Sequence, residues 1–242
     1  MREGEKHLTS EGYIITISSY RSSMDCDIIF DSGLSIENIQ YNQIKCGKVK
    51  NPFHPSIYNI GYIGLGGYLP SIGCKHTKAY EKWNTMLKRC YSSIYHNSHP
   101  TYRGCLVDKR WHNFQIFAEW FERNYIDGFE LDKDILVKGN RLYSPETCCF
   151  VPKKLNSLVL NNYKSRGEYP IGVSKHGSNF QAKCRINGKL IPLGTYDTII
   201  EAFIAYKEAK EANIKDIAEE YKCLIKENVY KELINYKVEI YD

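Results

Sequence analysis

The sequence predicts an α+β protein, and three observations support this fold class. Short runs of β-branched and aromatic residues, separated by polar turns, fill the first part of the chain. Two amphipathic helical patterns occupy the middle, and short strands followed by a capped helix form the last part. We therefore expect a small β-rich N-terminal module with a glycine-rich linker at residues 1–70, a central module at 75–160 and a C-terminal module at 165–242.

Composition is that of a globular protein that is neither secreted nor embedded in a membrane. The 242 residues are 43% hydrophobic, which is enough to build a packed core. No apolar run approaches the ~20 residues of a membrane helix, and the N-terminus leads into no apolar signal core. The net charge is +5, and the basic excess lies upstream of the C-terminal helical stretch, in the strand region.

The nine cysteines are an odd number and form no Cys-x-x-Cys pair, so we expect reduced thiols in a cytoplasmic protein. A structural zinc site is a weaker alternative, because the close ligand pairs that usually mark zinc are absent. Its ligands would be scattered along the chain: Cys74, Cys90, Cys105 and Cys148.

The first segment is predicted to form a small antiparallel barrel or curled sheet. Strand-like runs cover residues 13–20, 26–30 and 34–39, and Asp31-Ser-Gly33 is a turn signal. A glycine-rich run at 61–67 follows, but no helix opens directly after it. Because a phosphate-binding loop needs that helix, we interpret the run as an interdomain linker.

Two helices are predicted in the central segment. Apolar side chains recur at spacings of three and four between residues 78 and 91, and aromatic side chains do so between 111 and 125. We expect one helix in each range, joined by a polar loop at 92–103. Both apolar faces are assigned to core packing.

A strand–turn–strand–helix pattern follows at residues 131–158. Gly139-Asn140 supplies the turn, and Pro152 suits the first turn of the helix. The pattern places the side chains that could bind a metal or take part in catalysis at the end of its first strand and on its helix.

These side chains are Asp132, Lys133 and Asp134 on the strand end and Asn156 on the helix. Two carboxylates and an amide oxygen suit one hard divalent cation, Mg²⁺ or Mn²⁺. Such an ion can stabilise a cleaved phosphodiester and its leaving oxygen. From spacing alone, an exposed Asp/Lys loop with Asn156 capping a helix or facing solvent is the simpler interpretation.

Residues 131–158 resemble the nuclease motif of phage HNH homing endonucleases, the ββα-metal fold. The element order matches, and so does the spacing from Asp132 to Cys148 and on to Asn156. With the two preceding helices, the resemblance covers roughly residues 75–160. It implies a metal-dependent hydrolase acting on double-stranded DNA in the cytoplasm of a phage-infected bacterial cell, with Asp132 and Asn156 as metal ligands.

Lys133 departs from this family pattern. The family has a histidine general base beside the acid, and no histidine occurs here between His112 and His176. Lysine is an ammonium at neutral pH and therefore a poor base. Two interpretations stay open: Lys133 clamps a phosphate while Asp134 or a metal-bound water acts as base, or the motif is degenerate and the chain is a non-enzymatic DNA-binding protein.

The C-terminal segment predicts a basic three-stranded sheet followed by helices. Lys183 and Arg185 share one strand face by alternation, and Ala182, Cys184 and Ile186 share the other. Thr198 and Glu201 form a capping box that starts a helix to about residue 211, and a last helix is expected at 215–236. Residues 164–189 contain six cations and only one acid, Glu168. The cations are Lys164, Arg166, Lys175, Lys183, Arg185 and Lys189.

A sheet with this charge suits a polyanion, DNA first of all. The pattern resembles the AP2 DNA-binding domain at Gly172-Val173 and in residues 180–186, 193–198 and 201–206. The resemblance implies a sheet in the major groove with a helix packed behind it. We expect Arg185 to contact guanine and the lysines to contact phosphates; a merely solvated basic face is the alternative. The candidate DNA contacts are Lys175, Gln181, Lys183, Arg185 and Lys189.

Overall fold

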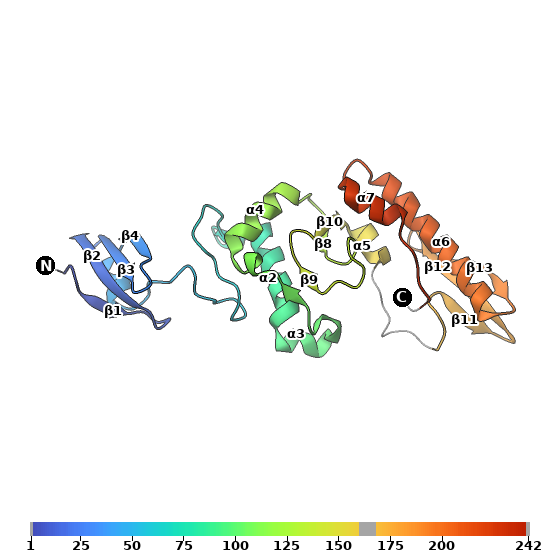
Figure 1. Ribbon diagram of the computed structural model, residues 1–242, viewed down its shortest axis with the longest axis horizontal. Coiled ribbons are helices and arrows are strands. Elements are labelled where there is room, and N and C mark those ends of the chain that lie inside the picture. The colour runs from blue at the N-terminus through green and yellow to red at the C-terminus, as the bar shows by residue number, and fades with distance from the viewer. Residues whose placement is uncertain (1, 160–167, 241–242) are drawn as a thin grey trace. The chain divides into compact units, whose positions relative to one another are not determined.

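The computed structural model describes residues 2–159 and 168–240 and has a mixed α+β fold, as the sequence predicts (Figure 1). Lys164 and Arg166 lie outside the described residues. The chain divides into two compact units, one of Met1–Arg103 with Lys109–Glu119 and one of Gly104–Asp108 with Trp120–Asp242. The three modules expected from sequence motifs stay a prediction.

The first unit begins with a four-stranded antiparallel meander. Its strands are β1 (Lys6–Leu8), β2 (Ile14–Ser22), β3 (Asp25–Phe30) and β4 (Ser35–Ile39), and each pairs with the next. The three predicted strands are confirmed, and Gly33 makes the predicted turn with φ of 85°. Alternation points Ile15, Ile17 and Ile28 into one core, which the short helix α1 (Tyr41–Lys45) covers with Ile44.

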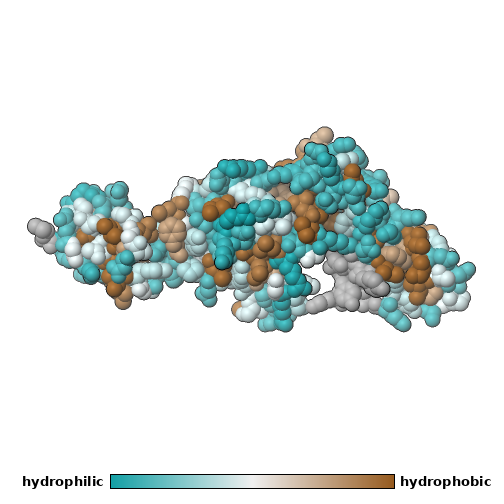
Figure 2. Space-filling model, viewed as in Figure 1, coloured by the Kyte–Doolittle hydropathy of each residue, from teal (hydrophilic) through white to brown (hydrophobic). Residues whose placement is uncertain are grey.

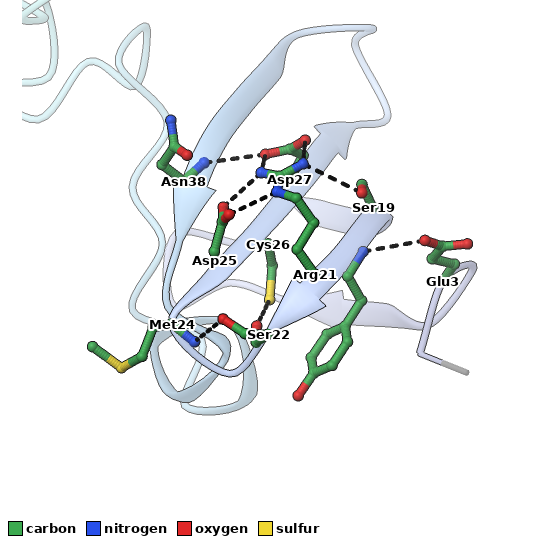
Figure 3. A network of polar contacts seen from close by, with 10 residues as sticks. Glu3, Ser19, Arg21, Ser22, Met24, Asp25, Cys26, Asp27 and Asn38 are labelled. Carbon is green, nitrogen blue, oxygen red and sulfur yellow. Dashed lines mark hydrogen bonds and ion pairs between the residues drawn. The ribbon is translucent and has the colours of Figure 1, made fainter.

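Arg21 holds the β2–β3 hairpin together on its exposed face (Figure 3). Its guanidinium donates to both oxygens of Asp25 and both oxygens of Asp27 at 2.6–2.7 Å, and the N–H of Asn38 donates to Asp27. The Arg21 hydrogen bonds lower the pKa of Asp25 and that of Asp27. Since the group is solvent-exposed, we assign it to fixing the irregular hairpin register rather than to overall stability.

The predicted helix at 78–91 is confirmed as α2 (Lys78–Tyr91), which starts after the N-cap Thr77. Trp83 is fully buried on its apolar face and donates its indole N–H to the carbonyl of Trp111 at 2.7 Å. A small hairpin of β5 (Ser71–Ile72) and β6 (Lys75–His76) precedes it.

The glycine-rich run lies against α2 instead of forming an open spacer. A Cβ on Gly61 would lie 2.5 Å from Cδ1 of Leu87. Gln115 fixes the far end of the run, because its side chain donates to the carbonyls of Ile63 and Tyr68 and accepts from the N–H of Tyr68. Close approach of neighbouring side chains explains Gly61, Gly64 and Gly66 without a phosphate cradle.

The predicted polar loop at 92–103 contains a helix, α3 (Ser93–Ser98), and a 3₁₀ turn, η1 (Pro100–Tyr102). Oγ of Ser92 accepts the N–H of Tyr95 and caps α3. The second predicted helix starts later than expected, since the 3₁₀ turn η2 (Lys109–His112) precedes α4 (Phe114–Asn124).

In the second unit, β8 (Phe129–Asp132) pairs antiparallel with β10 (Cys149–Pro152), and α5 (Lys153–Val159) packs against both. The predicted strand–strand–helix order is confirmed. The connection between the strands is longer than a tight turn: it contains Gly139 and β9 (Leu142–Tyr143), which pairs parallel with β7 (Leu106–Val107).

The same unit ends with an antiparallel sheet of β11 (Val173–His176), β12 (Asn179–Ile186) and β13 (Lys189–Tyr196). Behind it packs α6 (Ile199–Glu220), and α7 (Glu227–Ile234) follows. The capping box is confirmed by hydrogen bonds in both directions between Thr198 and Glu201. The helix break predicted near residue 212 is wrong, because α6 continues to Glu220 with Asn213 and Ile214 buried.

Candidate functional site

Asp132 ends β8 opposite Cys149 and is only 6% exposed. Its Oδ1 accepts the N–H groups of Asp134 at 2.7 Å and Ile135 at 2.8 Å, which turns the chain directly after the strand. Burial raises the pKa of this carboxyl group in spite of the two N–H bonds. Oδ2 accepts no hydrogen bond from the residues that the structure describes.

Asn156 lies on α5, the helix that packs against β8. Its Oδ1 is buried and has no hydrogen-bond partner within residues 2–159 and 168–240. A buried acceptor without a donor costs about 1–3 kcal/mol. The fold therefore keeps an oxygen that its own described groups leave unsatisfied, and a bound water or ion could satisfy it.

Lys133 turns inward. Its side chain is 10% exposed, and Nζ donates to both carboxylate oxygens of Asp134 at 2.8 and 2.7 Å and to the carbonyl of Asn140 at 2.6 Å. The amide of Asn140 donates to the carbonyls of Lys133 and Leu142 and closes the loop. Because Nζ is held by Asp134 and by the carbonyl of Asn140, Lys133 positions Asp134 and the loop.

Cys148, the residue at the middle motif position, is buried together with Cys149. Burial raises the pKa of Cys148 to about 12 and raises that of Cys149 as well. Both groups are therefore neutral thiols at physiological pH and fill space between β10 and its surroundings.

One carboxylate oxygen and one amide oxygen are the candidate metal ligands of this site. Among the described residues, no three or more His, Cys, Asp or Glu side chains are arranged to hold a metal. Magnesium needs fewer protein ligands, since it commonly keeps several waters and one or two carboxylates. Oδ2 of Asp132 and Oδ1 of Asn156 fit that requirement in chemistry, and neither oxygen has a donor among residues 2–159 and 168–240.

On the C-terminal sheet, the structure brings together Gln181, Lys183 and Arg185. They alternate along β12 with the buried Ala182 and Cys184, and Arg185 is exposed. The Nη1 of Arg185 donates to the carbonyl of Gly188 at 3.0 Å, which orients the guanidinium beside the β12–β13 turn.

The other two candidate cations fall on the opposite face by strand register. Lys175 pairs with Phe180, and Lys189 pairs with Ile186, the positions that alternate toward α6. Both lysines are exposed at strand ends. The face of Arg185 also carries the exposed Leu190, its direct partner across the strands, which sequence reasoning did not include.

Within the described ranges, none of the helices has the length and apolar character needed to cross a membrane. Comparison of the chain with protein-family models, curated proteins and solved structures finds no match.

Proposed function

We propose that the protein binds double-stranded DNA and hydrolyses its phosphodiester bonds with a divalent metal, as its sequence resemblance to HNH homing endonucleases implies. The observation that carries the proposal is the buried Oδ1 of Asn156, which has no hydrogen-bond partner among the described residues. Asn156 lies on α5, which packs against β8. Asp132 at the end of β8 adds a carboxylate oxygen that is likewise without a protein donor in that part of the chain.

In this proposal, Asp132 and Asn156 hold Mg²⁺ or Mn²⁺. The ion, when bound, supplies charge stabilisation to the cleaved phosphodiester. Asp134 has a 44% exposed side chain and can accept a proton from water, while Lys133 holds its carboxylate in place through two hydrogen bonds. Lys133 is thus a positioning residue, and the absence of a histidine base is met by Asp134.

The first test is nicking of supercoiled plasmid DNA in the presence of Mg²⁺ or Mn²⁺. Asp132→Ala and Asn156→Ala are each expected to slow nicking about 100-fold or more, because lost metal ligation removes several kcal/mol of charge stabilisation. Asp216→Ala, an exposed carboxylate on α6, is the matched control and should nick at the normal rate. Normal nicking by both site variants would remove this site assignment.

The second test concerns the sheet. Arg185→Ala is expected to reduce discrimination between DNA sequences by about 1–3 kcal/mol, whereas Lys183→Ala should weaken binding to all sequences and lower the salt slope by about 1. Selection from a randomised duplex pool, followed by fluorescence anisotropy, measures both effects. Lys215→Ala on α6 is the control. Isotherms unchanged in both sheet variants would rule out this face as the DNA reader.

The second candidate function is DNA binding without catalysis. It is favoured by one observation: Lys133, at the place of the family's histidine, is fully engaged with Asp134 and Asn140. Intact duplex binding with no metal-dependent nicking by the natural sequence would select this function over the nuclease.

A further inference from the structure

Two rows of side chains with different chemistry run along the face of the sheet β11–β13 that carries Arg185. On β12, Gln181, Lys183 and Arg185 offer hydrogen-bond donors. The residues that pair with them on β13 carry apolar groups instead. Because direct partners in an antiparallel pair lie on the same side of the sheet, both rows belong to one face. The partners are Thr195, Pro192 and Leu190, in the order of the donors.

Leu190 is the largest apolar side chain of the second row, and it lies at the surface. It is 57% exposed, whereas Ala182 on the opposite face is fully buried. Its pairing with Arg185 is fixed by the two-residue turn Asn187-Gly188, whose positive φ values of 49° and 78° are typical of a type I′ hairpin. The hairpin therefore presents Leu190 to any ligand of this face in a defined position beside Arg185.

The charge of this face favours duplex DNA over an apolar protein as its ligand. Residues 173–196 contain no Asp or Glu. Among the described residues, none forms an ion pair with Lys183 or Arg185. The guanidinium of Arg185 has further N–H groups for a ligand besides the one bonded to the carbonyl of Gly188. An apolar partner would bury these charges without a counter-charge, whereas the phosphates of DNA supply one.

Thymine is the base that an apolar side chain can recognise in the major groove. Its C5-methyl group lies at the edge of the groove, where guanine presents two acceptors that suit an arginine. Direct cross-strand partners have Cβ atoms roughly 5 Å apart, and stacked base pairs are about 3.4 Å apart. Arg185 and Leu190 would therefore reach bases that lie within about two base pairs of each other.

We infer that Leu190 contacts the methyl group of a thymine close to the guanine that Arg185 reads. The inference rests on the proposed function, because it requires this face of the sheet to enter the major groove. It assigns two kinds of readout to one face: β12 donates hydrogen bonds to bases and phosphates, and β13 recognises thymine by apolar contact. The DNA site is then one in which guanine and thymine are near neighbours.

The test uses the full chain and removes a single methyl group from the DNA. The preferred site is selected from a randomised duplex pool, and each thymine in it is replaced in turn by deoxyuridine. One replacement is expected to weaken binding by the natural sequence about fourfold, the effect of burying one methyl group. Leu190→Ala should bind the thymine and deoxyuridine duplexes with the same affinity in fluorescence anisotropy.

Leu224→Ala is the matched control, because Leu224 is a leucine of the same unit that is 52% exposed and lies outside the sheet. It should keep the preference for thymine over deoxyuridine. A preference kept by Leu190→Ala would overturn the inference. Equal affinity of the natural sequence for all the deoxyuridine duplexes would overturn it too, and this measurement needs no variant that might fail to fold.

Failure of the inference can be told from failure of the proposed function. If the natural sequence binds duplex DNA and Arg185→Ala loses the preference for guanine, but no thymine methyl group matters, only the inference fails. Binding that selects no preferred site at all overturns the inference in the same way. If the natural sequence binds no duplex DNA, the proposed function fails together with the inference.

Discussion

Gly172→Ala is expected to destabilise the C-terminal sheet and helix by about 3 kcal/mol. The backbone at Gly172 has φ of 77°, which a side chain makes unfavourable, and a Cβ there would lie 1.9 Å from Cδ2 of Tyr206. Tyr206 cannot move aside easily, because it is 5% exposed and packs in one core with Cys184, Phe203 and Val238. The ring or the start of β11 must shift, and either change disturbs the sheet–helix packing.

Urea denaturation, followed by circular dichroism, measures this effect. Gly177→Ala is the matched control, because Gly177 has a similar φ of 62° but nothing within 4 Å of the added Cβ. Its cost should be about 1 kcal/mol, from backbone conformation alone. Equal losses for the two variants would show that the Tyr206 contact adds nothing, and the packing of α6 on β11 would then need another explanation.

The sequence predicted those features of this sheet that depend on neighbouring residues. The alternation of Ala182 and Cys184 with Lys183 and Arg185 is confirmed, as is the capping box at Thr198 and Glu201. Both patterns are local, since alternation follows from strand geometry and a capping box spans four residues.

The pairing register of the strands could not be predicted from the sequence. The faces on which Lys175 and Lys189 fall depend on which residue lies across the strand, Phe180 for Lys175 and Ile186 for Lys189. A shift of one residue exchanges the two faces of a strand. For this reason, the composition indicated one basic face, whereas the register separates the five candidates.

The same distinction applies to the candidate metal site. Residue types and spacing indicated Asp132 and Asn156, and the structure packs their elements together. The partner of Lys133 was only half predicted: Asp134 is its neighbour in sequence, but Asn140 is brought back by the loop. Likewise, the spacing of glycines at 61–67 gave no sign that Leu87 and Gln115 would lie against them.

Asp132→Asn is expected to stabilise the protein at neutral pH by about 1 kcal/mol, a few degrees in Tm. Burial raises the pKa of Asp132 in the folded state, so the unfolded chain ionises first as the pH rises from the usual value near ~3.9. The protein loses stability as the pH rises from the unfolded pKa to the raised folded pKa of Asp132, and the loss persists at higher pH. Asparagine does not ionise, and its Oδ1 can still accept the N–H groups of Asp134 and Ile135.

Thermal melts at several pH values and with added Mg²⁺ measure this prediction. The advantage of Asp132→Asn should disappear below the unfolded pKa, and Mg²⁺ should raise the Tm of the natural sequence but not that of the variant. Asp134→Asn is the opposite control, because it removes the carboxylate that pairs with the nearly buried Lys133 and should destabilise the fold by about 1–2 kcal/mol. A lower Tm for Asp132→Asn at neutral pH would identify its carboxylate as a structural group. If Asp132→Asn has the higher Tm without Mg²⁺, and Mg²⁺ removes this difference by raising the Tm of the natural sequence, the carboxylate is one whose burial is tolerated because a cation binds it during function.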